Sequence, residues 1–237
     1  MIAAIFLLWI ISFLERSRQN KPAPKKKVMP RPGPEGGVRD TNRKEKAAAI
    51  KEAALHLFLE RGIDAVSVDD IMKRAGMAKG GFYRYFETQA VLVSEIIEPA
   101  RALMTKALED CSVDLETAAT RDAQFAAYRK VGDVVATLLM VHPGEVRLYL
   151  QECRAPANGP RVPIVELSKT VSKWAISITA QAQAHRILKP IPVPVSALTV
   201  VGASERLLLA VLQEEDIGNP LEVPEALATL ILDGLKA

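Results

Sequence analysis

The chain has 237 residues, of which 49% are apolar and 25% are charged, and this ordinary globular composition excludes a chain that is disordered throughout. Its 13 glycines follow no repeat, which excludes collagen, and its two distant cysteines, Cys111 and Cys153, exclude a disulfide-stapled scaffold. We expect both cysteines to be buried free thiols, as is usual in the cytoplasm. The length allows one large domain or two small ones.

The charge is unevenly distributed along the chain. Residues 1–46 hold eleven Lys or Arg and four Asp or Glu, whereas the remaining residues hold 20 basic and 24 acidic side chains. A basic N-terminal segment on a mildly acidic body indicates an anionic partner near the N-terminus.

The N-terminal segment, residues 1–42, is predicted to be an apolar run followed by a disordered basic linker rich in Pro and Gly. Residues 2–14 are apolar except Ser12, but a membrane-spanning helix needs roughly 20 residues. No Lys or Arg precedes the run, so a secretory signal fits poorly. Three alternatives stay open: membrane contact by residues 2–14, a basic arm that attracts phosphates, and a true start at Met29.

Helical signals dominate the next part of the chain. A first helix is predicted from the helical spacing of Ile50, Ala54, Leu57 and Phe58, ending at Gly62. Ser67 and Asp70 have the spacing of a short capping box for a second helix, which Gly76 ends. A third short helix is expected over residues 79–86, and Thr88 caps a long fourth helix in which Pro99 predicts a kink or a break.

The rest of the chain also has helical patterns, over residues 125–141, 144–153, 164–188, 195–213 and 224–235. Turn-rich segments separate them, and neither strand-like alternation nor an internal repeat is evident. The predicted fold class is therefore all-α.

The most informative segment is residues 67–86, SVDDIMKRAGMAKGGFYRYF. Two short helices joined by a glycine-containing turn form a helix-turn-helix, whose second helix enters the major groove of DNA. Lys79 and Arg84 have no acidic residue between them, and Phe82 and Phe86 lie four residues apart on a face that should pack inward.

Together with Phe58, Gly62 and Asp70-Ile71, the run AGMAKGGFYRYF resembles the N-terminal domain of the TetR family of bacterial transcriptional regulators. The resemblance covers residues 43–103 and implies a DNA-binding domain there, followed by a helical ligand-binding and dimerisation domain over residues 104–237. It further implies a homodimer that binds a palindromic operator on double-stranded DNA. The residues expected to meet DNA are Ser67, Lys79, Gly80, Gly81, Tyr83, Arg84 and Tyr85, although packing is the favoured role for Tyr85.

Two residues depart from the family pattern. Gln89 follows Thr88 where a phosphate-binding Lys is common, and Met72 stands where a small Ala is usual. We expect DNA affinity to depend more strongly on Lys79 and Arg84 as a result.

The resemblance also implies a small-molecule effector that releases the operator. Pockets between helices are mostly apolar with a few orienting polar groups. The expected lining consists of the aromatic residues of the second domain with adaptable methionines beside them: Met104, Phe125, Tyr128, Met140, Tyr149 and Trp174. A small rotation of the fourth helix near Pro99 would then change the spacing of the two recognition helices, which must lie about 34–36 Å apart on DNA.

The last two predicted helices are the expected dimer surface, because they carry more apolar residues than one internal face needs. These residues are Leu198, Val201, Leu208, Leu209, Leu212, Leu227, Leu230 and Ile231.

Enzymatic chemistry has no sequence support. The three histidines are far apart and lack metal-ligand spacing, so we expect no metal site, no cofactor and no catalytic residues. The predicted function is a cytoplasmic, ligand-responsive repressor. The alternative is a membrane-tethered or helical interaction protein with a vestigial helix-turn-helix, and the sequence identifies neither operator nor effector.

Overall fold

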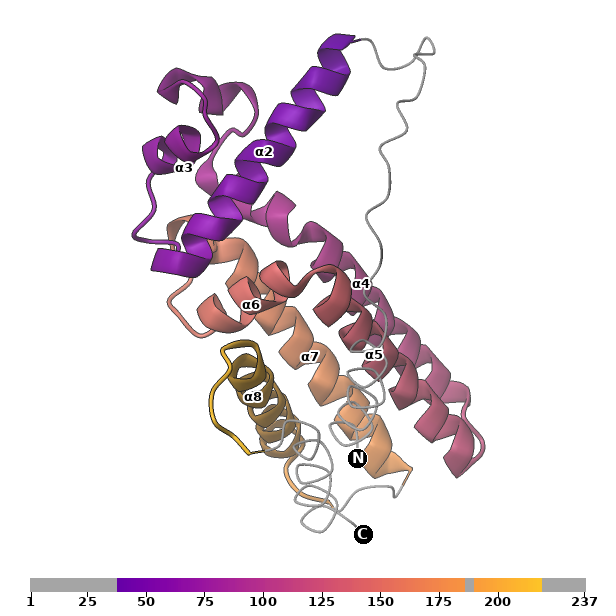
Figure 1. Ribbon diagram of the computed structural model, residues 1–237. Helices are drawn as coiled ribbons and strands as arrows, with labels where there is room; N and C mark the ends of the chain where they lie inside the picture. The colour runs from indigo at the N-terminus through magenta and orange to yellow at the C-terminus, as the bar shows by residue number, and fades with distance from the viewer. Residues whose placement is uncertain (1–37, 186–189, 219–237) are drawn as a thin grey trace.

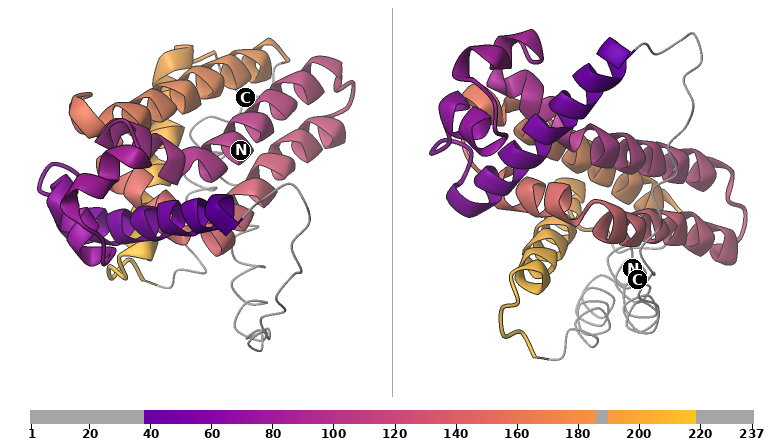
Figure 2. Two further views of the ribbon diagram at one scale, coloured as in Figure 1. Left: turned by 90° about the horizontal axis from the view of Figure 1, so that it is seen from above. Right: turned by 45° about the horizontal axis from the view of Figure 1, so that its top comes forward.

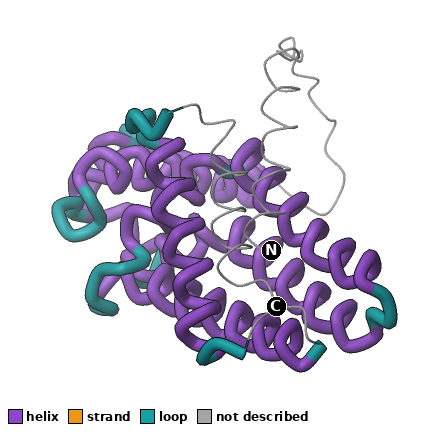
Figure 3. Tube along the Cα trace, turned by 90° about the horizontal axis from the view of Figure 1, so that it is seen from below, coloured by secondary structure: helices purple, strands orange, loops and turns teal. Residues whose placement is uncertain are grey.

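The computed structural model describes residues 38–185 and 190–218, and all regular structure in these ranges is helical (Figure 3). This confirms the all-α prediction. The predicted helix over residues 224–235 and the apolar run over residues 2–14 lie outside the described residues.

Within the described residues, three elements form one end of the molecule and five helices form its body (Figure 1). The first group consists of α2 Val38–Arg61, α3 Val68–Arg74 and the 3-10 helix η1 Lys79–Arg84. The body consists of α4 Gln89–Thr117, α5 Arg121–Val141, α6 Pro143–Glu152, α7 Val162–Ala184 and α8 Val193–Leu212, with a 3-10 turn η2 Gly159–Arg161 before α7. Figure 2 shows α4 running from the small group into the body beside α5 and α7.

Local sequence signals set the helix boundaries of the first group. The Ser67 hydroxyl accepts a hydrogen bond from the Asp70 amide at 3.2 Å, and the Asp70 carboxylate accepts one from the Ser67 amide at 3.0 Å, so the predicted capping box is confirmed. Gly62 and Gly76 have φ of 79° and 67°, the left-handed region that ends a helix and that glycine enters without strain. Thr88 caps α4 by accepting from the Val91 amide at 3.2 Å.

One hydrophobic cluster joins the two parts of the molecule. Phe82 and Phe86 are buried in it together with Leu57 and Ile71, as the spacing predicts. The same cluster includes Leu148 from α6 and other body residues, and α2 is the element of the first group that contacts the body helices α6 and α4.

The structure refines two details of the helical prediction. Residues 79–84 form a 3-10 helix that ends before Phe86, and α4 continues through Pro99, so the break is excluded there and the kink stays a prediction. Proline removes only one backbone donor, and the helix around it is held by the buried side chains of Ile96, Ile97 and Ala100. Helix α4 therefore runs across the expected domain boundary between residues 103 and 104.

Candidate DNA-binding surface and internal cavity

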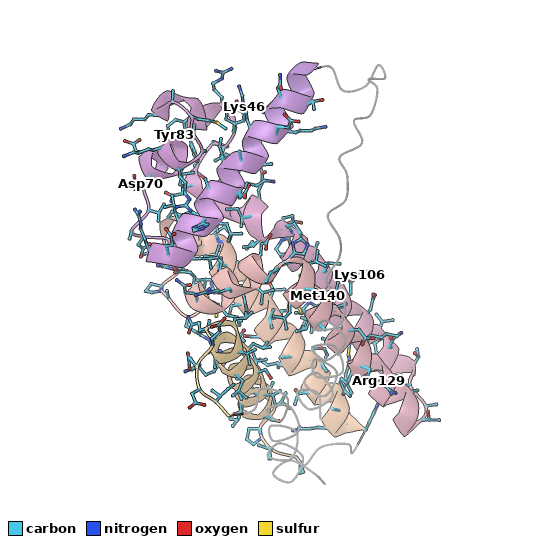
Figure 4. All side chains as sticks on the ribbon, viewed as in Figure 1. Lys46, Asp70, Tyr83, Lys106, Arg129 and Met140 are labelled. Atoms are coloured by element: carbon cyan, nitrogen blue, oxygen red, sulfur yellow. The ribbon has the colours of Figure 1, made fainter. Side chains whose placement is uncertain are left out.

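The 3-10 helix η1 presents polar side chains to solvent while its apolar side chains anchor it. Phe82 is fully buried, whereas Tyr83 is 70% exposed and meets the Phe82 ring edge-on, with the ring centres 5.4 Å apart. Lys79 and Arg84 are also exposed. We call these three exposed residues, Lys79, Tyr83 and Arg84, the reading surface; Figure 4 shows Tyr83 at the end of the molecule formed by α2 and α3.

An acidic side chain from α3 pairs with the reading surface. The Lys79 ammonium forms a salt bridge with the Asp69 carboxylate, and this hydrogen bond raises the pKa of Lys79. The sequence pattern did not indicate this partner, because Asp69 lies in the preceding helix and not between Lys79 and Arg84. Lys79 therefore carries its own counter-ion in the DNA-free protein.

Most of the other residues expected to contact DNA already have contacts within the protein. Ser67 is exposed, but its hydroxyl donates to the Asp70 carboxylate at 2.6 Å, and the hydrogen bonds from Ser67 lower the pKa of Asp70. Gly80 has open space around it, whereas a Cβ on Gly81 would lie 3.3 Å from the Met72 methyl carbon. Tyr85 is half-buried against the core.

Gln89, which replaces the expected lysine, has a structural contact instead. Its side-chain amide donates to the Val66 carbonyl oxygen at 2.9 Å. This bond ties the start of α4 to the loop that precedes α3.

A buried ionic network joins the loop after α2 to the body, and nothing in the sequence pattern indicates it. The Glu152 carboxylate accepts from the Ile63 amide at 3.1 Å and from the Arg161 guanidinium at 2.8 Å. Arg161 also donates to the Asp64 carboxylate at 2.8 Å and to the Asn158 side chain at 3.3 Å. We call Ile63, Asp64, Glu152 and Arg161 the interdomain joint. Ile63 and Glu152 are 89 residues apart in the sequence, and Asp64 and Arg161 are 97 apart. No local sequence signal could therefore have revealed these contacts.

A cavity of about 170 Å³ lies inside the body between α4, α5, α6, α7 and α8. Most of its lining is aliphatic, contributed by residues such as Ile97, Val135, Val171 and Leu208. The polar lining residues are Glu145, Tyr149, Thr179, Ser196, Ser204 and Glu205.

The structure brings two of the six expected effector residues, Met104 and Tyr149, to this cavity. Tyr128 instead lies in a second hydrophobic cluster, where its hydroxyl is buried and has no hydrogen-bond partner. Trp174 packs against that cluster, and Met140 is 52% exposed. These three residues are not among the described lining of this cavity, and their place in an effector site stays a prediction. The side chain of Phe125 lies outside the described residues.

Tyr149 takes part in a polar contact at the cavity. Its hydroxyl donates to one Glu205 oxygen at 2.6 Å, and Arg154 donates to the other at 2.5 Å. Burial, with the nearby Glu205 charge, raises the pKa of Tyr149, so the phenol keeps its proton at neutral pH.

Helix α8 is unusually apolar for a helix of which only a small part is buried. An 18-residue window in it has a mean hydropathy of 1.7, enough by length and composition to cross a membrane, yet only 28% of that window is buried. Val195 and Leu198 are exposed. One side of α8 lines the cavity, and the other is an uncovered apolar face within the described residues.

No cluster of three or more potential metal ligands occurs within residues 38–185 and 190–218. The two cysteines are buried and unpaired, as expected, and burial raises the pKa of Cys153 to about 11.

A short helix-turn-helix with an outward reading surface, seated on a helical body with an internal cavity, defines the class of helix-turn-helix regulators with a helical second domain. The family model for bacterial regulatory proteins of the tetR family matches residues 50–96. This part of the chain is therefore similar to the N-terminal, DNA-binding domain of TetR-family transcription regulators.

Relatives share the DNA-binding domain most strongly. The transcriptional regulator YvdT of Bacillus subtilis is 43% identical over 49 residues, which cover 21% of this chain and 25% of that protein. The chain spans between a quarter and less than half of the length of the first curated relatives that it matches.

Solved structures share the whole fold at low identity. NalD, the secondary repressor of the MexAB-OprM multidrug efflux pump in Pseudomonas aeruginosa, superposes with a TM-score of 0.60 at 20% identity, covering 82% of this chain and 98% of that one. FadR from Bacillus subtilis in complex with stearoyl-CoA gives a TM-score of 0.56 at 20% identity, covering 79% and 98%.

Proposed function

We propose that the protein is a sequence-specific transcriptional repressor that binds a palindromic operator as a homodimer and is released by a small, mostly apolar effector. The single observation that carries the proposal is the reading surface. Lys79, Tyr83 and Arg84 face solvent on a short helix whose Phe82 is buried, so the helix can contact DNA without unfolding.

The DNA contacts divide into two kinds. Lys79 and Arg84 supply positive charge for phosphates or for guanine, and the Tyr83 hydroxyl can donate to a phosphate oxygen. Ser67 and Gly80 are exposed beside them. Gly81 and Tyr85 stay in the proposal as residues that support the helix more than they contact DNA, because both meet the protein's own core.

Dimerisation is supported by α8. Its outer face is apolar and largely uncovered in the described residues, and burying such a face against the same helix of a second copy would remove it from water. The two copies would place two reading surfaces on one side of the dimer.

Effector control is supported by the path of α4. The helix begins at Thr88 beside the helix-turn-helix and contributes Ile97, Met104 and Leu108 to the cavity wall. A ligand that favours one position of α4 would shift the population between DNA-binding and released conformations. FadR binds stearoyl-CoA, which shows that a neighbour of this fold holds a ligand with a long apolar chain.

The test is selection of bound duplexes from a random pool, followed by affinity measurements over a salt series. We expect a palindromic sequence whose affinity falls steeply as salt rises. Tyr83→Phe and Lys79→Ala should each weaken operator binding by about tenfold, on the order of one phosphate or base contact. Lys106→Ala is the matched control, since Lys106 is an exposed, paired lysine on α4 at a distance from the reading surface (Figure 4).

Wild-type affinity in either reading-surface variant would remove that residue from the proposed site. Failure of the purified chain to bind any duplex would favour the alternative, a helical interaction protein with a vestigial helix-turn-helix.

A further inference from the structure

The charged groups in the cavity wall are all of one sign. Glu145 enters from α6 and Glu205 from α8, and no Lys or Arg is among the described lining residues. A carboxylate or phosphate placed in this cavity would lose its water and face like charges without a cationic partner. The lining therefore opposes an anionic ligand.

The two carboxylates differ in how well they are already paired. Both oxygens of Glu205 accept short hydrogen bonds, one from Tyr149 and one from Arg154, whose side chain is mostly exposed outside the cavity. Glu205 is thus neutralised by a cation that does not itself line the cavity.

Glu145 has no comparable partner. The His142 ring nitrogen lies 3.4 Å from the Glu145 carboxylate oxygen, which is longer than a normal N–H···O hydrogen bond. Both side chains are only 21% exposed, so water screens Glu145 poorly. The carboxylate also lies in the first turn of α6, where the helix dipole favours negative charge. The negative charge in the cavity wall that lacks a strong partner is therefore that of Glu145.

We propose that this cavity binds a lipophilic ammonium ion, with the protonated amine at Glu145 and an aliphatic chain along the apolar wall. The inference rests on the proposed function only in that it names the effector class. Tyr149 is the only aromatic residue in the described lining, which favours a flexible chain over a stacked planar ring. A volume of about 170 Å³ slightly exceeds the roughly 150 Å³ of a dry cavity that holds benzene, so the buried chain has on the order of six to eight carbons.

The experiment compares three probes of equal chain length, octylammonium, octanol and octanoate, by isothermal titration calorimetry on the full chain at neutral pH. We expect octylammonium to bind once per chain, octanol to bind about tenfold more weakly, and octanoate to bind too weakly to measure. Octanoate binding as tightly as octylammonium would overturn the proposal.

Glu145→Gln keeps the shape of the side chain and removes its charge. We expect it to weaken octylammonium binding about tenfold and to leave octanol binding within about twofold, which also shows that the variant is folded. Glu166→Gln is the matched control, because Glu166 is exposed on α7 and pairs with Lys169 away from the cavity wall. Adsorption of the amphiphile to the apolar face of α8 would be insensitive to Glu145→Gln, and that result would also overturn the proposal.

Operator binding is measured separately in the presence of octylammonium. If the probe binds with the expected selectivity and the operator complex stays intact, the ligand class holds and the effector part of the proposed function fails. If the chain binds its operator but not octylammonium, the ligand class fails and DNA binding stands.

Discussion

Two sets of charged residues, the interdomain joint and the reading surface, differ in burial and in what they can do. In the interdomain joint the Arg161 side chain is 8% exposed and has Glu152 and Asp64 as partners. In the reading surface the Lys79 side chain is 78% exposed and has Asp69 as its partner. The buried Arg161–Glu152 pair cannot open without leaving a charge unpaired in the interior, whereas the Lys79–Asp69 pair can open into water.

The buried charges of the interdomain joint therefore suit a structural role, whereas the exposed Lys79 suits a binding role. Burial lowers the pKa of Arg161, but its hydrogen bonds to Glu152 and Asp64 outweigh burial and raise the pKa overall, so the guanidinium stays charged. A charge held in this way fixes the position of the loop after α2 on the body. The exposed Lys79–Asp69 pair instead leaves a cation that can exchange its carboxylate for a phosphate.

The largest expected effect is the loss of Arg161. Arg161→Leu removes one partner of a buried ion pair and leaves the Glu152 carboxylate without its counter-ion, so we expect the free energy of unfolding to fall by about 3–5 kcal/mol. Urea denaturation followed by circular dichroism measures the change. Lys130→Leu is the control, because Lys130 forms an exposed pair with Asp114, and exposed pairs contribute little to stability. A loss at Arg161 as small as that of the control would show that the joint does not hold the two parts together.

The next effect in size is a gain in operator affinity when Asp69 is replaced. Asp69→Asn removes the carboxylate that competes with phosphate for Lys79. Because water screens this exposed pair, operator affinity should rise only by about two- to fivefold. Electrophoretic mobility shift at low salt measures it, with Asp114→Asn as the distant control. Weaker binding by Asp69→Asn would mean that the carboxylate orients Lys79 for DNA and does not compete with DNA.

The smallest effect concerns the capping box beside the reading surface. Hydrogen bonds from Ser67 lower the pKa of Asp70 below its ordinary 3.8, so this carboxylate stabilises the folded state above pH 3.8, and the contribution is lost as pH falls through the lowered value. Ser67→Ala should move the pKa back toward 3.8, as measured by side-chain carboxyl NMR. An unchanged pKa would show that the Ser67 contacts are not formed in solution.

The sequence predicted those features that depend on residues close together in the chain. Ser67 with Asp70, Thr88, and the glycines at 62 and 76 each act within a few residues, and each does what its pattern indicates. The inward packing of Phe82 and Phe86 followed from their spacing in the same way.

Features that depend on distant residues could not be predicted. Glu152 meets Ile63 only because α6 packs on α2, and nothing near Glu152 in the sequence marks that contact. The predicted cavity lining differs from the described one for a related reason. Tyr128 and Met140 lie on α5, which lines the cavity through Val131, Val135 and Leu138, and only the rotation of the helix about its axis decides which residues face inward.

Helix α4 shows how tertiary packing limits the effect of a local signal. Pro99 predicted a kink or a break, and the break does not occur, because buried residues on both sides keep the helix continuous from Gln89 to Thr117. The sequence therefore identifies the DNA-binding unit well, whereas it identifies the ligand site only as a mostly apolar pocket between helices.

The interdomain joint also has a consequence for exchanging parts between relatives. A DNA-binding unit transplanted onto this body would have to supply a backbone amide at position 63 and an acid at position 64, or the Glu152–Arg161 pair would lose its two contacts with the loop after α2. Chimeras made from this chain should thus keep residues 62–64 together with Glu152 and Arg161.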